Sequence, residues 1–195
     1  WKHVNCLHSA DDIVESLHYI KTALPDKQVA LLDLVKERQK LFSTEFPIVC
    51  TYKANGTRSK TEKIHYKGKL AVKKTFKFGC ERFAEREAFA YQTFSELCDA
   101  VPPLLESGEN YIIIPWYENS LAGLNSRQKK LIIKPFSQQI LSAMRCFYDN
   151  GYAIIGFYPG NLIITPEGDL RVIDFEFIYK YKSIPSKFSL SYDLA

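Results

Sequence analysis

The sequence predicts an α+β fold, in which a five-strand antiparallel sheet with one helix is followed by a mainly helical part. Strand-like alternation of apolar and polar residues runs from Pro47 to Phe78. Apolar residues then recur at helical spacing over Glu81–Leu97 and again over Ser126–Tyr148. Three parts are therefore predicted: a helical arm or linker over 1–46, a sheet part over 47–117 and a helical part over 118–195.

The arm is predicted to contain two helices separated by Pro25. Apolar residues keep a helical spacing up to Leu24, where Pro25 removes a backbone donor and interrupts the helix. A second apolar stripe contains Val29, Leu32 and Val35. We expect this arm to pack on the domain that follows, with a link to an upstream domain or self-association with a second copy as alternatives.

The sheet part is predicted to begin as a three-strand meander with turns at Asn55-Gly56 and Lys67-Gly68. The three strands are Ile48–Tyr52, Thr61–Tyr66 and Lys69–Phe76. The helix over Glu81–Leu97 ends before Pro102-Pro103. Two further strands complete the sheet, at Leu104-Leu105 and Tyr111–Pro115.

The helical part is predicted to begin with a long helix over Ser126–Tyr148, which Pro135 can split. Asn150-Gly151 ends this helix. A short hairpin follows, with strands at Leu162–Ile164 and Leu170–Ile173.

Composition bounds the class of protein. The net charge is +4, and the basic residues between Arg58 and Lys77 are interleaved with aromatics, but no nucleic-acid-binding motif accompanies them. The five cysteines include no C-x-x-C pair, which favours reduced thiols and a cytoplasmic location. No apolar run approaches the roughly 20 residues that span a bilayer, so no transmembrane segment is predicted.

Two oxygen-bearing side chains flank the predicted hairpin. Asn161 stands directly before its first strand, and Asp174 directly follows its second strand. A hairpin brings these positions close together in space. An amide oxygen and a carboxylate are hard ligands that suit Mg²⁺. The pair is therefore the predicted metal site.

A lysine and a glutamate from the sheet part are candidates for the same site. Lys73 lies in the third strand within Leu70-Ala71-Val72-Lys73, and Glu87 lies in the following helix. A buried ammonium needs a carboxylate to hold it in position, and Glu87 is expected to be that partner, with Glu85 as the alternative.

The chain from Pro47 to Ala195 resembles the protein-kinase-like phosphotransferase superfamily. Its short spacings and its Pro159-Gly160-Asn161 turn are more similar to bacterial aminoglycoside, choline and lipopolysaccharide-core kinases than to eukaryotic protein kinases. The resemblance implies a two-lobed kinase-like fold, truncated in its helical lobe. It also implies that Lys73 holds nucleotide phosphates and that Asp174 lies in a D-F-G-type turn.

The resemblance further implies the cofactors ATP and Mg²⁺. Gly56 would lie in the turn that covers the nucleotide, and Ile114 to Tyr117 would form the hinge, with Trp116 and Tyr117 flanking the adenine. Asn161 and Asp174 would hold the metal. Tyr192-Asp193 is similar to the start of the later helix whose aspartate braces the catalytic loop.

The chain departs from the family pattern at Gly156. This glycine stands five positions before Asn161, where the family has its general-base aspartate. Two hypotheses follow. The first is phosphoryl transfer to a hydroxyl of a glycan, lipid-linked sugar or small molecule, with Glu176 or Asp149 replacing the base. The second is a pseudokinase, acting as a nucleotide-binding or structural module of a larger protein.

Overall fold

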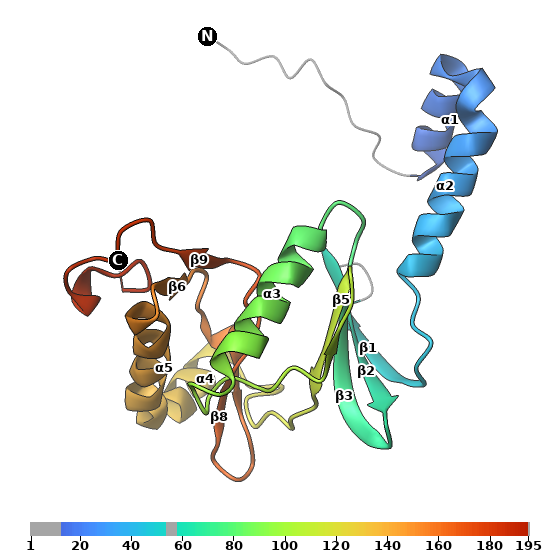
Figure 1. Cartoon of the computed structure of the whole chain (residues 1–195). Helices are drawn as coiled ribbons and strands as arrows, with labels where there is room; N and C mark the ends of the chain where they lie inside the picture. The colour runs from blue at the N-terminus through green and yellow to red at the C-terminus, as the bar shows by residue number, and fades with distance from the viewer. Residues whose placement is uncertain (1–12, 54–57, 195) are drawn as a thin grey trace. The chain divides into compact units, whose positions relative to one another are not determined.

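The computed structural model describes residues 13–53 and 58–194. The chain divides into two compact units, Trp1–Ser43 and Thr44–Ala195. The described part of the first unit contains α1 (Ile13–Ala23), the 3-10 helix η1 (Pro25–Lys27) and α2 (Gln28–Leu41) (Figure 1). Pro25 stands at the start of η1, where a missing N–H leaves no hydrogen bond unmade. The two predicted helices are confirmed, and one tight turn joins them.

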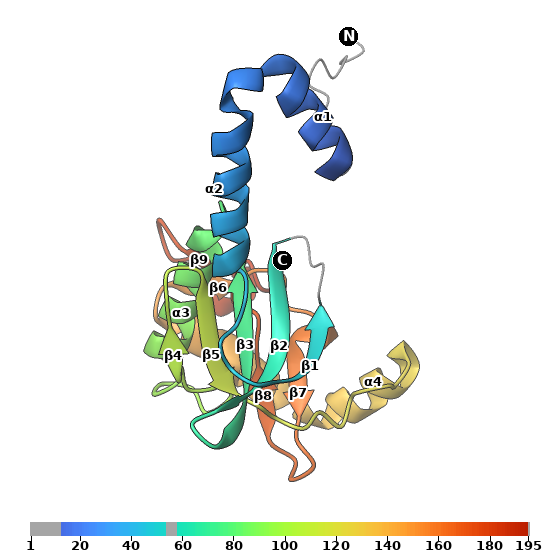
Figure 2. The same cartoon turned by 90° about the vertical axis from the view of Figure 1, so that its right-hand side faces the viewer.

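The second unit begins with a five-strand antiparallel sheet in the order β1-β2-β3-β5-β4 (Figure 2). The strands are β1 (Ile48–Lys53), β2 (Ser59–Tyr66), β3 (Lys69–Phe76), β4 (Glu106–Ser107) and β5 (Tyr111–Pro115). Lys67 and Gly68 both have positive φ angles, 48° and 78°, as a two-residue hairpin turn requires. This turn sets the register that pairs Tyr66 with Lys69.

Helix α3 (Glu81–Phe94) packs against the sheet (Figure 1). Because side chains alternate along a strand, successive residues of β3 face opposite sides. Val72 packs with the main core, whereas Ala71 belongs to a separate small cluster on the other face. The sheet therefore has two distinct environments, and the side of Val72 is the side that meets α3.

The rest of the second unit holds two helices and two small two-strand sheets. The helices are α4 (Ser126–Ile133) and α5 (Ser137–Asp149), with the 3-10 helix η2 (Lys134–Phe136) between them at Pro135. The first small sheet pairs β6 (Tyr152–Ile154) with β9 (Ile178–Lys180), and the second pairs β7 (Leu162–Ile164) with β8 (Leu170–Val172). The remaining 3-10 helices are η3 (Pro159–Asn161) and η4 (Phe188–Leu190).

The main core lies among α3, β5, α5 and the β7–β8 hairpin. Three fully buried phenylalanines from different elements form its centre. Phe94 stacks on Phe147 with ring centroids 3.9 Å apart, and Phe147 stacks on Phe175 at 5.3 Å. Phe175 directly follows Asp174, so the core fixes the turn that carries this carboxylate.

Two details of the predicted elements were wrong, and one pair of strands was missed. The fourth strand is Glu106–Ser107 rather than Leu104-Leu105, because Glu106 pairs with Ile113 and its carboxylate accepts hydrogen bonds from two tyrosines. Helix α3 ends at Phe94 rather than at Leu97, and in the turn that follows the N–H groups of Leu97 and Cys98 both donate to the Phe94 carbonyl. The β6–β9 pair was not predicted.

Candidate functional site

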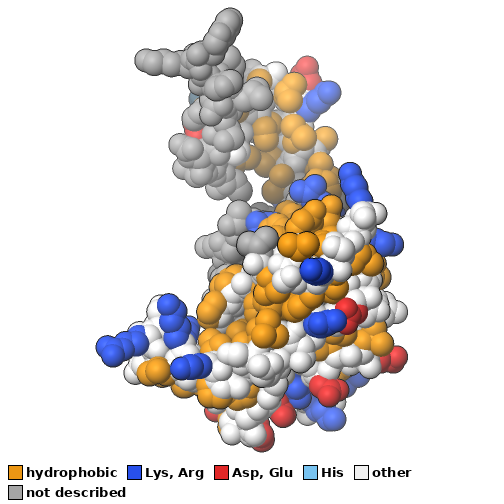
Figure 3. All heavy atoms as spheres, turned by 90° about the vertical axis from the view of Figure 1, so that its left-hand side faces the viewer, with side chains coloured by type: hydrophobic (Ala, Val, Ile, Leu, Met, Phe, Trp, Pro, Cys, Tyr) orange, Lys and Arg blue, Asp and Glu red, His pale blue; other side chains and the backbone are white. Residues whose placement is uncertain are grey.

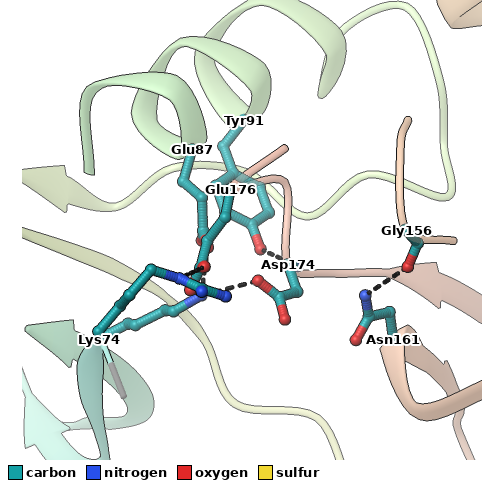
Figure 4. Close-up of polar contacts among 8 residues, drawn as sticks. Lys74, Glu87, Tyr91, Gly156, Asn161, Asp174 and Glu176 are labelled. Atoms are coloured by element: carbon teal, nitrogen blue, oxygen red, sulfur yellow. Dashed lines mark hydrogen bonds and ion pairs between the residues drawn. The ribbon is translucent and has the colours of Figure 1, made fainter. Parts of the chain in front are cut away.

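Lys74 on β3 is the centre of a cluster of charged side chains (Figure 4). Its ammonium contacts Glu87 Oε1 on α3, lies 2.8 Å from Asp174 Oδ1 and lies 2.7 Å from Glu176 Oε1. Burial lowers the pKa of Lys74, but the three carboxylates outweigh it and raise the pKa overall. Lys74 is therefore a permanently charged group that joins the sheet, α3 and the segment after β8.

The expected pairing of Lys73 with Glu87 was wrong. Lys73 and Lys74 are neighbours on one strand, so they point to opposite faces of the sheet. The Lys73 ammonium lies on the far face, 4.4 Å from the Tyr111 ring centroid and 5.3 Å from that of Phe46. Burial lowers its pKa. The lysine that meets Glu87 is Lys74, one residue later than the A-x-K spacing suggested.

Glu87 and Tyr91 lie one turn apart on α3 and face the same cluster. The Glu87 side chain is 1% exposed, and burial raises its pKa to about 8 although Lys74 opposes the shift. Its second oxygen, Oε2, is buried without a hydrogen-bond partner among the described residues. The Tyr91 hydroxyl accepts a hydrogen bond of 3.2 Å from the Asp174 N–H. Helix α3 thus holds both Lys74 and the backbone of Asp174.

Asp174 stands in a strained backbone conformation. Its φ angle is 71°, in the left-handed region that non-glycine residues seldom adopt and that costs about 1 kcal/mol or more. The Tyr91 hydrogen bond and the burial of Phe175 hold this conformation. The next carboxylate, Glu176, is buried and accepts a 2.7 Å hydrogen bond from Arg58 Nε. Both carboxylates point toward Lys74, with one oxygen of each within 2.8 Å of its ammonium.

The carboxylates of Glu87, Asp174 and Glu176 form a group of potential metal ligands. One oxygen from each lies within 4.8 Å of the others. From the sequence, Glu176 was proposed as a replacement for the general base rather than as a partner of the lysine, and its position two residues after Asp174 was the available signal. Arg58 was seen only as part of a basic stretch, because no local pattern links it to Glu176.

Asn161 lies on the other side of Asp174 from Lys74 (Figure 4). It is 7% exposed, and its amide Nδ2 donates a 3.4 Å hydrogen bond to the Gly156 carbonyl. The Asn161 carbonyl accepts a 2.9 Å hydrogen bond from the Ile173 N–H, which ties the 3-10 turn to the strand that precedes Asp174. The hairpin thus brings the two predicted metal ligands into one site.

Gly156 supplies no proton acceptor to this loop. Its φ angle is 86°, and a Cβ added there would meet no atom within 4 Å. The two proposed substitutes are engaged elsewhere: Glu176 with Lys74 and Arg58, and Asp149 with Arg145 at 3.5 Å. In Figure 4, Glu176 lies on the Lys74 side of Asp174, away from Gly156. Neither substitute is placed to act as the base.

The predicted hinge residues are held by contacts within the unit. Ile114 is part of the main core. The Trp116 ring stacks on Tyr52 with centroids 5.6 Å apart and planes 7° apart, and Lys63 Nζ lies 4.0 Å from its centroid. The Tyr117 ring has the Arg171 guanidinium 5.3 Å from its centroid. Gly56 lies outside the described residues.

No protein-family model matches this chain, and a search of curated proteins finds no match. Among the helices that the structure describes, none is both long enough and apolar enough to cross a membrane.

Proposed function

We propose that residues 44–195 form a kinase-like domain that binds a nucleoside triphosphate with a divalent cation at the Lys74 cluster. The observation that carries the proposal is the convergence of Lys74, Glu87 and Asp174 from a strand, a helix and a post-hairpin turn. Kinase-like phosphotransferases place a strand lysine, a helix glutamate and a turn aspartate in these roles. The five-strand order with α3 against the sheet is consistent with their smaller lobe.

The donor set fits Mg²⁺. Asp174, Glu176 and the Asn161 amide offer the hard oxygen ligands that this ion prefers. Bound Mg²⁺ would neutralise phosphate charge at this place. Lys74, held by Glu87, would contact phosphate oxygens, and Asn161 and Asp174 would hold the ion.

The loop that carries Gly156 and Asn161 favours a role in nucleotide binding without efficient phosphoryl transfer. General-base assistance is typically worth about 10²- to 10⁴-fold in rate, and Gly156 cannot provide it. Trp116 stacked on Tyr52 would also have to move before it could flank an adenine. Phosphoryl transfer to a hydroxyl acceptor is the second candidate, favoured by the open space over Gly156 and by the dominance of positioning in this chemistry.

The proposal is tested by calorimetric titration of ATP into the full chain, with Mg²⁺ and with a chelator. We expect binding that requires Mg²⁺ and that weakens at least about tenfold in Asp174→Ala, because a metal-ligand carboxylate is lost. Asp169→Ala is the matched control, since this carboxylate is exposed in the turn between β7 and β8.

Absence of binding by the folded wild-type chain would contradict the proposal, as would equal affinity of wild type and Asp174→Ala. ATP turnover measured on the same samples separates the two candidates. Turnover by the wild type would favour phosphoryl transfer, and binding without turnover would favour the pseudokinase role.

A further inference from the structure

Helix α4 lies in a strongly basic segment of the chain. No Asp or Glu occurs from Asn119 to Tyr148, whereas this segment contains Arg127, Lys129, Lys130, Lys134 and Arg145. The segment therefore has a charge of +5, while the whole chain has +4 and its remainder is slightly acidic. It is one of two strongly basic stretches of the chain, and the other runs from Arg58 to Lys77.

Two basic residues of α4 and Lys134, which directly follows the helix, form one outward stripe with Leu131. Arg127, Lys130, Leu131 and Lys134 recur at the i, i+3, i+4, i+7 spacing of one helix face, and all four are exposed. The opposite face packs on the main core through Ile132 and Ile133. A capping box between Asn125 and Gln128, with hydrogen bonds of 3.0 Å in both directions, fixes the start of the helix. The stripe is thus held on a well-defined helix.

The stripe is open to a partner. Helix α4 projects from the body of its unit in Figure 2, and blue side chains gather on the same projection, at the left in Figure 3. Within the part of the chain that the structure describes, Arg127, Lys129, Lys130 and Lys134 form no ion pair. Leu131 is 67% exposed between these cations. An exposed leucine surrounded by cations with long aliphatic stems suits a surface that has anionic groups on the outside and an apolar layer under them.

We infer that α4 is a docking site for an anionic membrane surface, with the cations contacting lipid phosphates and Leu131 entering the acyl boundary. Leu131 favours a membrane over a nucleic acid, since phosphate contacts alone would leave this side chain in water. The inference concerns a face separate from the Lys74 cluster and does not depend on nucleotide binding.

Co-sedimentation of the full chain with vesicles tests the inference. We expect binding to vesicles of phosphatidylcholine mixed with phosphatidylglycerol, weaker binding as salt is added, and none to phosphatidylcholine alone. Lys130→Gln with Lys134→Gln should weaken binding roughly 25-fold, because each lysine near an anionic surface contributes about fivefold. Leu131→Ser should weaken it about tenfold through lost apolar burial.

The matched control is Lys182→Gln with Lys187→Gln, which removes the same charge from exposed positions outside α4. We expect this control to bind the mixed vesicles as the wild type does. A melting curve by circular dichroism verifies that each variant is folded. The inference is overturned if the folded wild type ignores the mixed vesicles, or if the control pair loses as much binding as the α4 pair. Tighter binding to a DNA duplex that Leu131→Ser leaves unchanged would also overturn it.

Discussion

At the scale of single residues, Asp193 holds the loop that carries Gly156 and Asn161. Its Oδ1 accepts a 2.6 Å hydrogen bond from the N–H of Ile154, at the end of β6 just before this loop. Burial raises the pKa of Asp193 to about 6, although the Ile154 hydrogen bond favours the ionised form. One partly buried carboxylate therefore fixes where the loop begins.

This pKa gives a testable pH dependence. Because the folded-state pKa is raised from 3.8 to about 6, the folded state binds the proton more tightly, and the free energy of unfolding falls as pH rises through this window. Asp193→Asn keeps an acceptor for Ile154 but does not titrate, so its stability should vary less with pH. Asp193→Ala leaves the buried N–H unsatisfied and should cost about 1–3 kcal/mol.

Urea unfolding of both variants and the wild type, at several pH values from 3.8 to 6, measures these effects. An unchanged pH slope in Asp193→Asn would show that Asp193 does not cause the dependence.

The sequence predicted the glutamate of the site correctly but not the lysine. Glu87 was expected to hold a lysine and does, because E-x-x-x-Y at helical spacing puts two functional groups on one face. The choice between Lys73 and Lys74 could not be made from the sequence. Two adjacent lysines on a strand differ only in the face to which they point, and that face depends on packing by distant elements.

At the scale of elements, three phenylalanines connect α3, α5 and the turn after β8. Phe147 on α5 lies between Phe94 and Phe175, and all three rings are fully buried. Through Phe175 the stack reaches the strained turn of Asp174. Packing of α5 therefore supports the candidate site indirectly, through Phe175, and needs no direct contact with the charged cluster to do so.

Phe147→Ala should lower the free energy of unfolding by about 3–5 kcal/mol, because a large buried ring is replaced by a cavity. Phe78→Ala is the matched control, since Phe78 is 64% exposed and its truncation should change stability little. Denaturant unfolding monitored by circular dichroism measures both. A loss below about 1 kcal/mol for Phe147→Ala would contradict the central position of this ring.

The long elements were predictable because their patterns are local. The alternation in β2 and β3 and the helical spacing in α3 and α5 are read within one segment. The short strands were not. Residues of β6 and β9 pair only because the chain returns to the same place, and the two-residue β4 is too short to show a period.

At the scale of the whole molecule, the candidate site depends on contacts between segments distant in the sequence. Arg58 and Glu176 are 118 positions apart, and Lys74 and Asp174 are 100 apart. The described hydrophobic clusters that bring these segments together consist of residues from the second unit. The sequence predicted Glu87, Asn161 and Asp174 as candidate site residues but chose Lys73 in place of Lys74, because the convergence of these groups follows from this packing.

We propose that Lys74, and not Lys73, is the lysine of the nucleotide site. The Mg-ATP affinities of Lys74→Met and Lys73→Met test this proposal, after melting curves have verified that both variants fold. We predict that Lys74→Met weakens binding at least about tenfold, through the loss of a charge-assisted contact, while Lys73→Met binds as the wild type does. Loss of binding in Lys73→Met with full binding in Lys74→Met would contradict this account.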